Sequence, residues 1–300
     1  MQFGRSSQRK SMTAFPTDTE QRRGSHTRPA AELRAKLRAF AATSLGVNVG
    51  RLILAGTFLS VWQFGANRLF DPFFFGTPIA IFQQLLRELI SLDFYHDLGV
   101  TALEMAAGFG IGASSGIILG VLLARWDYIA SVVDPFLLAL NSIPRIALAP
   151  MLIVWFGIDM ASKVFLGATL VFFITFFNTL AGIRSVERAL CDVARVQGAS
   201  DWQIFTKVML PSASTWIMTG IKMSLPFALV GVIIGEFLVS SHGLGYRLNA
   251  YSTSYNTVGA VSMIIIMMMS MMLLTTLVDR LEAKLMRWRP SRDLGPIARA

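Results

Sequence analysis

Apolar residues in this chain run in long stretches, and most polar residues gather between them. Several stretches exceed the roughly 20 apolar residues that a helix needs to cross a hydrocarbon core about 30 Å thick. The pattern predicts six transmembrane helices, at about residues 47–68, 98–124, 130–157, 160–182, 214–240 and 257–279. We therefore expect an all-α polytopic membrane protein.

Composition agrees with a membrane protein and argues against nucleic acid as a partner. The 300 residues are 54% hydrophobic and 15% charged, whereas soluble domains carry about 25% charged residues. The net charge is +9, with nine Lys and Arg before residue 46 and six after residue 279. Positive charge that flanks membrane segments is typical of topology signals rather than of a groove that binds nucleic acid.

The placement of Lys and Arg also predicts the orientation in the membrane. The two tails, the turn at Arg125 and the loop 183–213 hold 20 Lys and Arg, and the alternate loops hold four. Positive residues favour the cytoplasmic side. We expect a multi-pass protein of the cell inner membrane with both termini and the loop 183–213 in the cytoplasm.

Three regions follow from this pattern. Residues 1–45 are predicted to be a basic cytoplasmic tail, partly disordered because residues 1–30 have no apolar period. Residues 32–45 fit a helix on the membrane surface and a solvated basic tail equally well. Residues 46–284 form the predicted transmembrane domain, and residues 285–300 a second cytoplasmic tail.

Four glycines lie on one face of the second predicted span. Gly108, Gly112, Gly116 and Gly120 are spaced four residues apart. Small residues at this spacing let a second backbone approach closely in lipid. The face fits packing inside the helix bundle, and it also fits a sliding or subunit-forming surface.

The third predicted span contains Pro135, Pro144 and Pro150. Proline removes a backbone donor and clashes with the preceding turn. This span is therefore expected to be kinked or broken.

Ionisable residues within predicted spans are candidates for a substrate pathway. Arg145 follows a proline in the third span, and an arginine at mid-membrane costs about 2.5–3.5 kcal/mol on insertion scales. Glu104 and Glu236 are its candidate partners. The three residues fit either a structural ion pair with snorkelling side chains or a solute pathway.

Residues with metal-binding or catalytic chemistry form no recognisable set in the sequence. Cys191 is the single cysteine, and we expect an inert thiol. The methionine-rich run at 263–272 lies inside an apolar span and is expected to serve packing. His26, His96 and His242 lie in separate segments, so no metal site and no catalytic residue is predicted.

The loop between the fourth and fifth spans is predicted to contain two short amphipathic helices. Ser185 is a plausible N-cap of the first, and Gly198 is the residue expected at its left-handed C-terminal cap. Ser200 and Gln203 fit a capping box at the start of the second helix, which is expected to end before Pro211. Neither helix is long enough to span a bilayer.

Apolar residues share one face on each of these helices. Val193 and Val196 do so on the first, and Trp202, Phe205 and Met209 on the second. A cytoplasmic helix pair with an apolar stripe must bury it against the membrane, its own bundle or a soluble partner.

The spacing in this loop resembles the signature of ABC-importer permeases, which is EAA, three residues, Gly, nine residues, then I-x-L-P. This chain has Asp192-Val193-Ala194, then Gly198, then Val208-Met209-Leu210-Pro211 at the same spacing. Asp for Glu, Val for Ala and Val for Ile are departures. The segments FFFGTP, TALEMAAGFGIG, PRIALAPMLIVWFG, LAGIRSV and GEFLVSSHGLGY extend the resemblance over about residues 70–280, toward the nitrate, sulfonate, taurine and thiamine-precursor class.

The resemblance implies that the loop is a coupling helix seated in a groove of a cytoplasmic ATPase. The residues implied for this role are Asp192, Val193, Ala194, Gly198, Ala199, Trp202, Phe205, Val208, Leu210 and Pro211. It further implies two ATP-binding subunits, a second permease copy forming a homodimer, and an extracytoplasmic solute-binding protein.

The resemblance implies the permease subunit of an ATP-driven importer that passes a small solute from the binding protein into the cytoplasm. The chain has no G-x-x-x-x-G-K-[ST] loop. It is therefore not expected to be an enzyme or to hold a cofactor, and ATP and Mg²⁺ are expected on the ATPase. The alternative is a membrane scaffold or assembly factor that keeps the fold without transporting.

Overall fold

The computed structural model describes residues 43–66, 68 and 71–285. The chain divides into two compact units, residues 1–61 with 291–300, and residues 62–290. In the first unit the structure describes Thr43 and the part of α3 (Ser44–Gly65) up to residue 61. The expected tails, and the helix expected at 32–45, therefore lie almost wholly outside the described residues.

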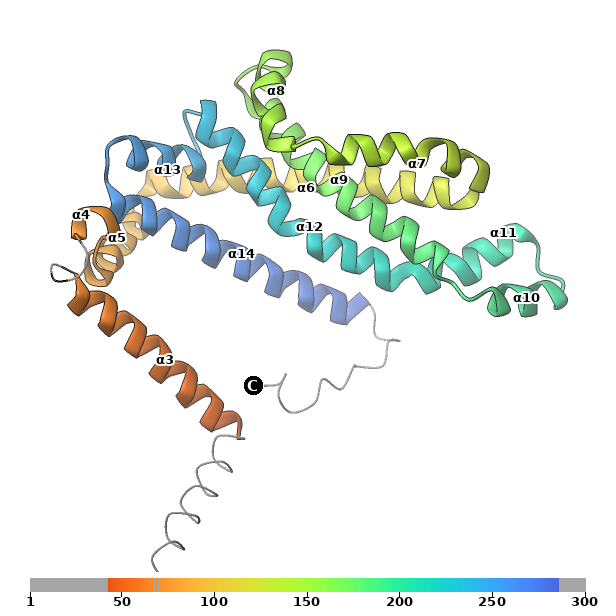
Figure 1. Cartoon of the computed structure of the whole chain (residues 1–300), viewed down its shortest axis with the longest axis horizontal. Helices are drawn as coiled ribbons and strands as arrows, with labels where there is room; N and C mark the ends of the chain where they lie inside the picture. Colours follow the sequence, from red (N-terminus) through yellow and green to blue (C-terminus); the bar gives the residue numbers. More distant parts are fainter. Residues whose placement is uncertain (1–42, 67, 69–70, 286–300) are drawn as a thin grey trace, which may run out of the picture. The chain divides into compact units, whose positions relative to one another are not determined.

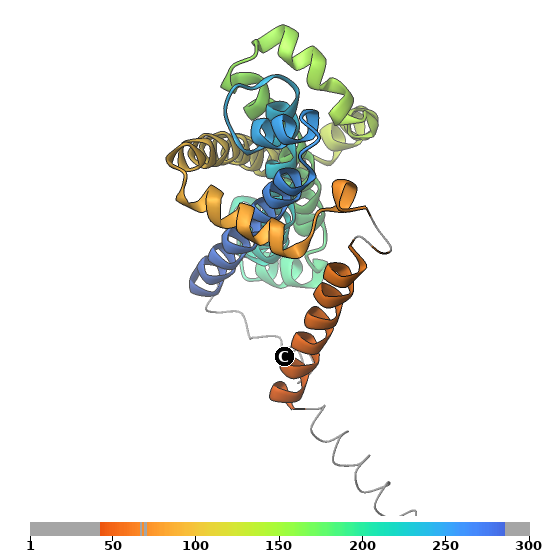
Figure 2. The same cartoon turned by 90° about the vertical axis from the view of Figure 1, so that its left-hand side faces the viewer.

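The elements of the described chain are helices, which confirms the all-α prediction. After α3 they are α4 (Pro72–Phe75), α5 (Pro78–Ile90), α6 (Leu92–Arg125), α7 (Asp127–Ser142), η1 (Arg145–Leu148), α8 (Ala149–Phe156), α9 (Met160–Arg184), α10 (Arg188–Val196), α11 (Asp201–Ile204), η2 (Phe205–Met209), α12 (Leu210–Val239), α13 (Leu244–Thr253) and α14 (Thr257–Leu285). Figure 1 shows α10 and α11 at one end of the second unit and α13 at the other, and Figure 2 views that unit from the α13 end.

Five of these helices are long and apolar enough to cross a membrane, and a bent pair supplies the sixth span. The pair joins Tyr128–Ser142 to Arg145–Phe156 at an angle of 79°. The predicted break in the third span is therefore confirmed, and Pro144 marks its place. Ile143 before it takes an extended ψ of 126°, because the proline ring disfavours helical backbone in the preceding residue.

The other two prolines of this span do not break it. Pro135 lies inside α7. Pro150 occupies the first turn of α8, where a missing backbone N–H costs nothing because that donor has no helical partner.

The core of the second unit lies where α6, α9 and α12 pack together. One buried cluster joins Met105 and Ala113 of α6 to Val171 of α9 and to Ala228 and Val232 of α12. Many large apolar side chains elsewhere on the described helices are exposed, as expected of a surface that faces lipid. Burial is thus concentrated on the few helix faces that meet.

The glycines of α6 allow its close approach to α9. A Cβ built on Gly108 lies 2.9 Å from the carbonyl oxygen of Val164, and one on Gly112 lies 2.5 Å from that of Ala168. Gly116 and Gly120 face the same helix. The structure thus places all four glycines against α9 of the same chain, as close packing inside the bundle requires.

We expect Gly112→Ala to destabilise the protein by about 1–3 kcal/mol, the usual effect of overpacking a tight interface. Gly110→Ala, two residues away, is the matched control, because its Cβ meets no described atom within 4 Å. The control should be neutral or stabilising by up to about 1 kcal/mol, since alanine is the better helix former. Thermal unfolding in detergent measures both, and equal midpoints for the two variants would contradict a tight α6–α9 contact.

Several predicted boundaries are wrong. The second span begins at Leu92 rather than at residue 98. Residues 78–90 and 244–253 form helices α5 and α13 where none was predicted. Thr77 is the N-cap of α5, and its side chain accepts a hydrogen bond from the backbone N–H of Ala80 at 3.3 Å. The pair Thr77-Pro78 in the sequence could have predicted this helix start, because proline favours the first helical position.

Candidate functional site

The turn between α10 and α11 closes with a complete set of capping hydrogen bonds. Gly198 has a φ of +84°, which confirms the predicted left-handed cap. Its N–H donates to the carbonyl of Arg195 at 3.0 Å, and the N–H of Ala199 donates to that of Ala194 at 3.0 Å. These two bonds are the Schellman motif, which satisfies carbonyls that the helix end leaves unpaired.

The second helix begins with the predicted capping box. The Ser200 hydroxyl accepts from the N–H of Gln203 at 3.3 Å, and the Gln203 side chain accepts from the N–H of Ser200 at 2.9 Å. Both ends of the turn are therefore fixed by capping hydrogen bonds. The hairpin formed by α10, α11 and η2 (residues 188–209) is called the coupling hairpin below, after the role that the sequence resemblance implies.

Two predictions about this hairpin are wrong. The first helix begins at Arg188, with Glu187 at the N-cap. Ser185 instead ends α9, where its hydroxyl donates to the carbonyl of Gly182 at 2.9 Å. Ser185 therefore caps the C-terminal end of α9 and not the start of α10.

The second helix does not end before Pro211. It widens into the π-helix η2 and continues into α12, so that residues 201–239 form one apolar helical run. The N–H of Leu210 donates to the carbonyl of Phe205, five residues back. A π turn has more room than an α turn, and we infer that it accommodates the ring of Pro211 at the start of α12. The coupling hairpin is therefore joined to a membrane helix without a loop.

The apolar residues of the coupling hairpin divide into a buried and an exposed group. Phe205 is buried with Ile183 and Ala213 at the base of the hairpin. Val193 is 59% exposed, Val196 89% and Trp202 60%. The predicted face of Trp202, Phe205 and Met209 is thus split, because Phe205 and Met209 pack on the bundle while Trp202 stays largely exposed and contacts only Phe205 and Arg125 among the ring contacts of the described residues.

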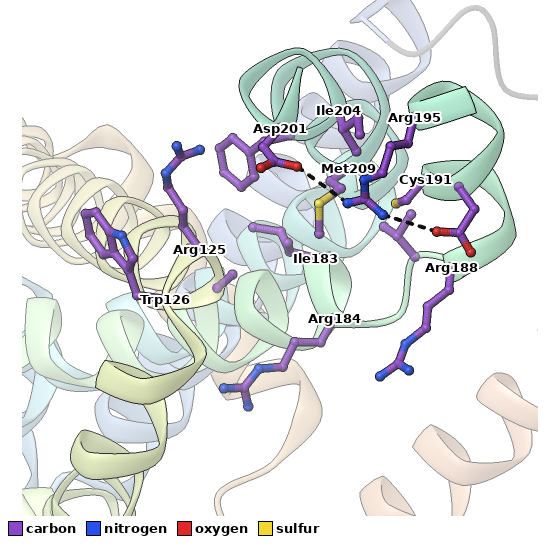
Figure 3. Close-up of a pocket in the computed structure, with 14 residues that line it drawn as sticks. Arg125, Trp126, Ile183, Arg184, Arg188, Cys191, Arg195, Asp201, Ile204 and Met209 are labelled. Carbon is purple, nitrogen blue, oxygen red and sulfur yellow. Dashed lines mark hydrogen bonds and ion pairs between the residues drawn. The ribbon is translucent and has the colours of Figure 1, made fainter. Parts of the chain in front are cut away.

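A cavity of about 820 Å³ lies between the hairpin and the ends of α6 and α9 (Figure 3). Its lining includes four arginines, namely Arg125, Arg184, Arg188 and Arg195. Arg195 bridges Asp192 at 3.3 Å and Asp201 at 3.4 Å, so it ties α10 to the start of α11. The guanidinium of Arg125 lies 5.1 Å from the ring centre of Trp202. The cavity therefore has a basic lining beside the exposed apolar side chains.

The remaining residues that the signature singles out lie in the same hairpin and its exit. Ala194, Ala199, Val208 and Leu210 are half-buried, and Asp192 and Pro211 are exposed. The hairpin therefore brings the whole signature into one short structural element.

Of the three candidate pathway residues, Glu104 and Glu236 interact with each other, and Arg145 lies apart from both. The Nζ of Lys163 lies 2.5 Å from the Oε1 of Glu104, and both side chains are buried. Glu236 accepts from the Thr101 hydroxyl and from the N–H of Gly245, both at 2.7 Å. The prediction that Glu104 and Glu236 are the partners of Arg145 is therefore wrong. The partner of Glu104 is instead Lys163, which lies in the first turn of α9 and was not among the candidate pathway residues.

Arg145 lies at the break between α7 and α8 and has other neighbours. Its guanidinium donates to the backbone carbonyl of Asn141 at 3.3 Å and to the Asn141 side chain. It also lies 4.5 Å from the ring centre of Phe173. Within the described chain no carboxylate lies within ion-pair distance of Arg145, so its charge is not neutralised there.

A second polar cluster, at the α13 end of the unit, was missed from the sequence. Arg247 binds Glu88 at 2.8 Å and also binds Asp97, and the Tyr251 hydroxyl donates to Glu88. Burial works against the charged guanidinium of Arg247, but its bonds to Asp97 and its attraction to Glu88 raise its pKa above the usual value. Burial, and then the bond to Glu88, raise the pKa of Tyr251 to about 12. No local pattern links residues that lie more than a hundred positions apart.

Comparisons with known proteins agree on one family. The family described as "Binding-protein-dependent transport system inner membrane component" matches residues 116–288. The chain is 33% identical over 243 residues to the putative aliphatic sulfonates transport permease protein SsuC of Bacillus subtilis, covering 81% of this chain and 88% of that protein. It is 31% identical over 229 residues to the formylaminopyrimidine transport permease protein ThiX of Halalkalibacterium halodurans, covering 76% and 91%. A solved structure of the MetNI methionine ABC transporter is 20% identical, with a TM-score of 0.48 over 67% of this chain and 95% of that chain.

Proposed function

This chain belongs to the family of binding-protein-dependent transport system inner membrane components, the permease subunits of ATP-driven ABC importers, and we propose that its coupling hairpin docks on the ATPase. The single observation that carries this proposal is a capped hairpin with exposed apolar side chains at Val193, Val196 and Trp202. Exposed apolar surface next to polar and basic groups is typical of a protein–protein contact.

The direct continuation of the hairpin into α12 supplies the route for motion. A helix transmits a displacement along its axis better than a flexible loop, because its hydrogen bonds resist bending. The π turn and the buried contact of Phe205 with Ile183 and Ala213 hold the hairpin against the bundle. Closure of the ATPase would therefore move α12 together with the hairpin.

The family implies an ATPase and a solute-binding protein as partners. We propose two ATPase subunits, a homodimer of this chain and cytoplasmic termini, with ATP and Mg²⁺ bound only by the ATPase. The four Lys and Arg against three Asp and Glu of residues 184–211, and the basic cavity beside the hairpin, support this orientation, because positive residues favour the cytoplasmic side.

Replacing Val196 with lysine is expected to abolish co-purification with the cognate ATPase, because a charge enters a contact that excludes water. Gln197→Lys is the matched control, since it adds the same charge to the neighbouring exposed position at the helix end. The measurement is the amount of ATPase retained on the purified permease. Equal retention by both variants would show that apolar contact at Val196 does not hold the complex.

For the solute we propose an anion of the aliphatic sulfonate type. The relatives carry the names of sulfonate and formylaminopyrimidine permeases. Of the three candidate pathway residues, Glu104 is paired with Lys163 and Glu236 is bonded to Thr101 and Gly245. Arg145 alone keeps a charge available to a solute, and a guanidinium binds a sulfonate as it binds other oxyanions.

Arg145→Gln is expected to lower sulfonate uptake about 10-fold or more, since hydrogen bonds to charged groups contribute about 1.5–3 kcal/mol. The assay is uptake into liposomes that contain the permease, its ATPase and its binding protein, with an alkanesulfonate and a formylaminopyrimidine as alternative solutes. Basal ATP hydrolysis serves as the control for assembly. Unchanged sulfonate uptake, or uptake of the pyrimidine alone, would contradict an anionic solute.

A further inference from the structure

Two histidines that are far apart in the sequence meet at the α13 end of the second unit. His96 lies in the first turns of α6, and His242 lies in the connection between α12 and α13. Their ring centres are 5.1 Å apart, and the ring planes meet at 75°. Both side chains are mostly exposed, at 63% and 60%. The fold therefore places two accessible imidazoles side by side.

A buried carboxylate completes the group. The Oδ1 of Asp97 lies 3.9 Å from the Nδ1 of His96 and 3.7 Å from the Nδ1 of His242. One nitrogen of each imidazole and this oxygen all lie within 4.8 Å of one another. Nitrogen, nitrogen and carboxylate oxygen form a donor set typical of zinc sites that keep a fourth position for water.

The distances allow a metal ion after a small adjustment. Zn–N bonds of about 2.0–2.1 Å in a tetrahedron place the donor atoms about 3.3 Å apart. Donor atoms that now lie within 4.8 Å of one another must therefore move closer together by up to about 1.5 Å. The exposed imidazoles can rotate by that amount, since no close packing fixes them.

The carboxylate is held in place for this role. Its Oδ1 accepts the N–H of Gly243 at 2.9 Å, and its other oxygen accepts from Arg247. A carboxylate oxygen has two lone pairs, so Oδ1 keeps one that faces the two histidines. Asp97 thus supplies an oriented ligand, and the two imidazoles supply adaptable ones.

The charge around the group favours a cation. Asp97, Glu88 and Arg247 are joined by ion pairs. With neutral imidazoles, the formal charges of these three side chains add up to −1. Imidazole nitrogen selects zinc, copper and nickel over magnesium and calcium, which prefer oxygen ligands. The local charge and the donor type therefore agree.

We propose that His96, Asp97 and His242 form a binding site for a divalent transition-metal ion of the zinc class. The ion joins the start of α6 to the connection between α12 and α13. Because α12 is continuous with the coupling hairpin, the bound metal restrains the far end of the helix that the hairpin moves. The spacing of histidines in the sequence predicts no metal site, because His96 and His242 lie 146 residues apart.

The test is titration of the full-length permease, purified in detergent without a polyhistidine tag, with Co²⁺ and then Zn²⁺. We expect one Co²⁺ per chain, visible absorption bands of a tetrahedral ion, and displacement by Zn²⁺. His96→Ala and His242→Ala should each weaken Zn²⁺ binding by about 100-fold or more, because changes to outer-shell partners alone cost 10–100-fold. His26→Ala, which removes the third histidine of the chain, should leave binding unchanged.

Two results would overturn the site. One is full Zn²⁺ binding by the variant that lacks both His96 and His242. The other is the absence of saturable binding in the unaltered protein, which would leave the two rings as an edge-to-face pair only. Thermal unfolding without metal verifies that each variant is folded. Zn²⁺ should raise the unfolding midpoint of the unaltered protein and leave that of the double variant unchanged.

Discussion

Gly198→Val is expected to abolish solute uptake while the ATPase of the assembled complex continues to hydrolyse ATP. Gly198 has a φ of +84°, a region that a β-branched residue adopts only under strain. The cost is about 1–2 kcal/mol or more. An added Cβ would meet no described atom within 4 Å, so the effect comes from the backbone of the turn and not from a collision.

The strain acts on the bonds that join the two helices. The N–H groups of Gly198 and Ala199 bond to carbonyls of α10, and a valine that leaves the left-handed region would break both. Trp202 would then shift relative to Val193 and Val196. If these three side chains dock on one groove of the ATPase, its closure no longer moves α12.

Gly198→Asn is the matched control, because asparagine tolerates left-handed backbone better than other residues with side chains. It should keep most of the uptake. Uptake and ATP hydrolysis are measured in the same liposomes, with co-purification of the ATPase as the measure of assembly. Normal uptake by the valine variant would show that the conformation of this turn does not matter for coupling.

Lys163→Met is expected to destabilise the permease by about 3–5 kcal/mol, the usual result of leaving one partner of a buried ion pair alone. The side chains of Lys163 and Glu104 are 6% and 3% exposed, and their charged atoms lie 2.5 Å apart. Lys163 also donates to the hydroxyl of Ser240 at 3.1 Å. Removal of the ammonium would leave a carboxylate in a dry interior.

The double variant Lys163→Met with Glu104→Leu separates the two interpretations of Glu104. Replacing a whole buried pair by apolar residues is often neutral or stabilising, so we expect it to recover most of the lost stability and to transport. A folded double variant without uptake would instead place Glu104 on the solute pathway. Asp134→Asn is the control: its partner Arg184 is 3.6 Å away and both are partly exposed, so its cost should stay below about 1 kcal/mol.

Features that depend on neighbouring residues could be predicted from the sequence. The six spans follow from runs of apolar residues, and the break at Pro144 follows from a ring that disfavours the helix before it. Gly198 and the Ser200–Gln203 capping box were predicted correctly for the same reason. Their chemistry acts within a few residues, so it does not require the fold to be known.

The errors lie where two signals compete within a short range. Ser185 is suited to begin a helix, yet its hydroxyl bonds back to Gly182 and closes α9. Pro211 ordinarily ends a helix, but a π turn before it lets the helix continue into α12. Packing of Phe205 on Ile183 and Ala213 favours the continuous helix, and no residue pattern shows that packing.

By itself the sequence determined an all-α membrane protein, the places of its spans and the signature of the coupling hairpin, because hydrophobic length and capping chemistry are local. Only the tertiary structure decided which charges meet. It paired Glu104 with Lys163, left Arg145 without a carboxylate among the described residues, and brought His96 and His242 to Asp97. The physical reason is that each of these contacts joins side chains from different helices, and their distance is set by how the helices pack.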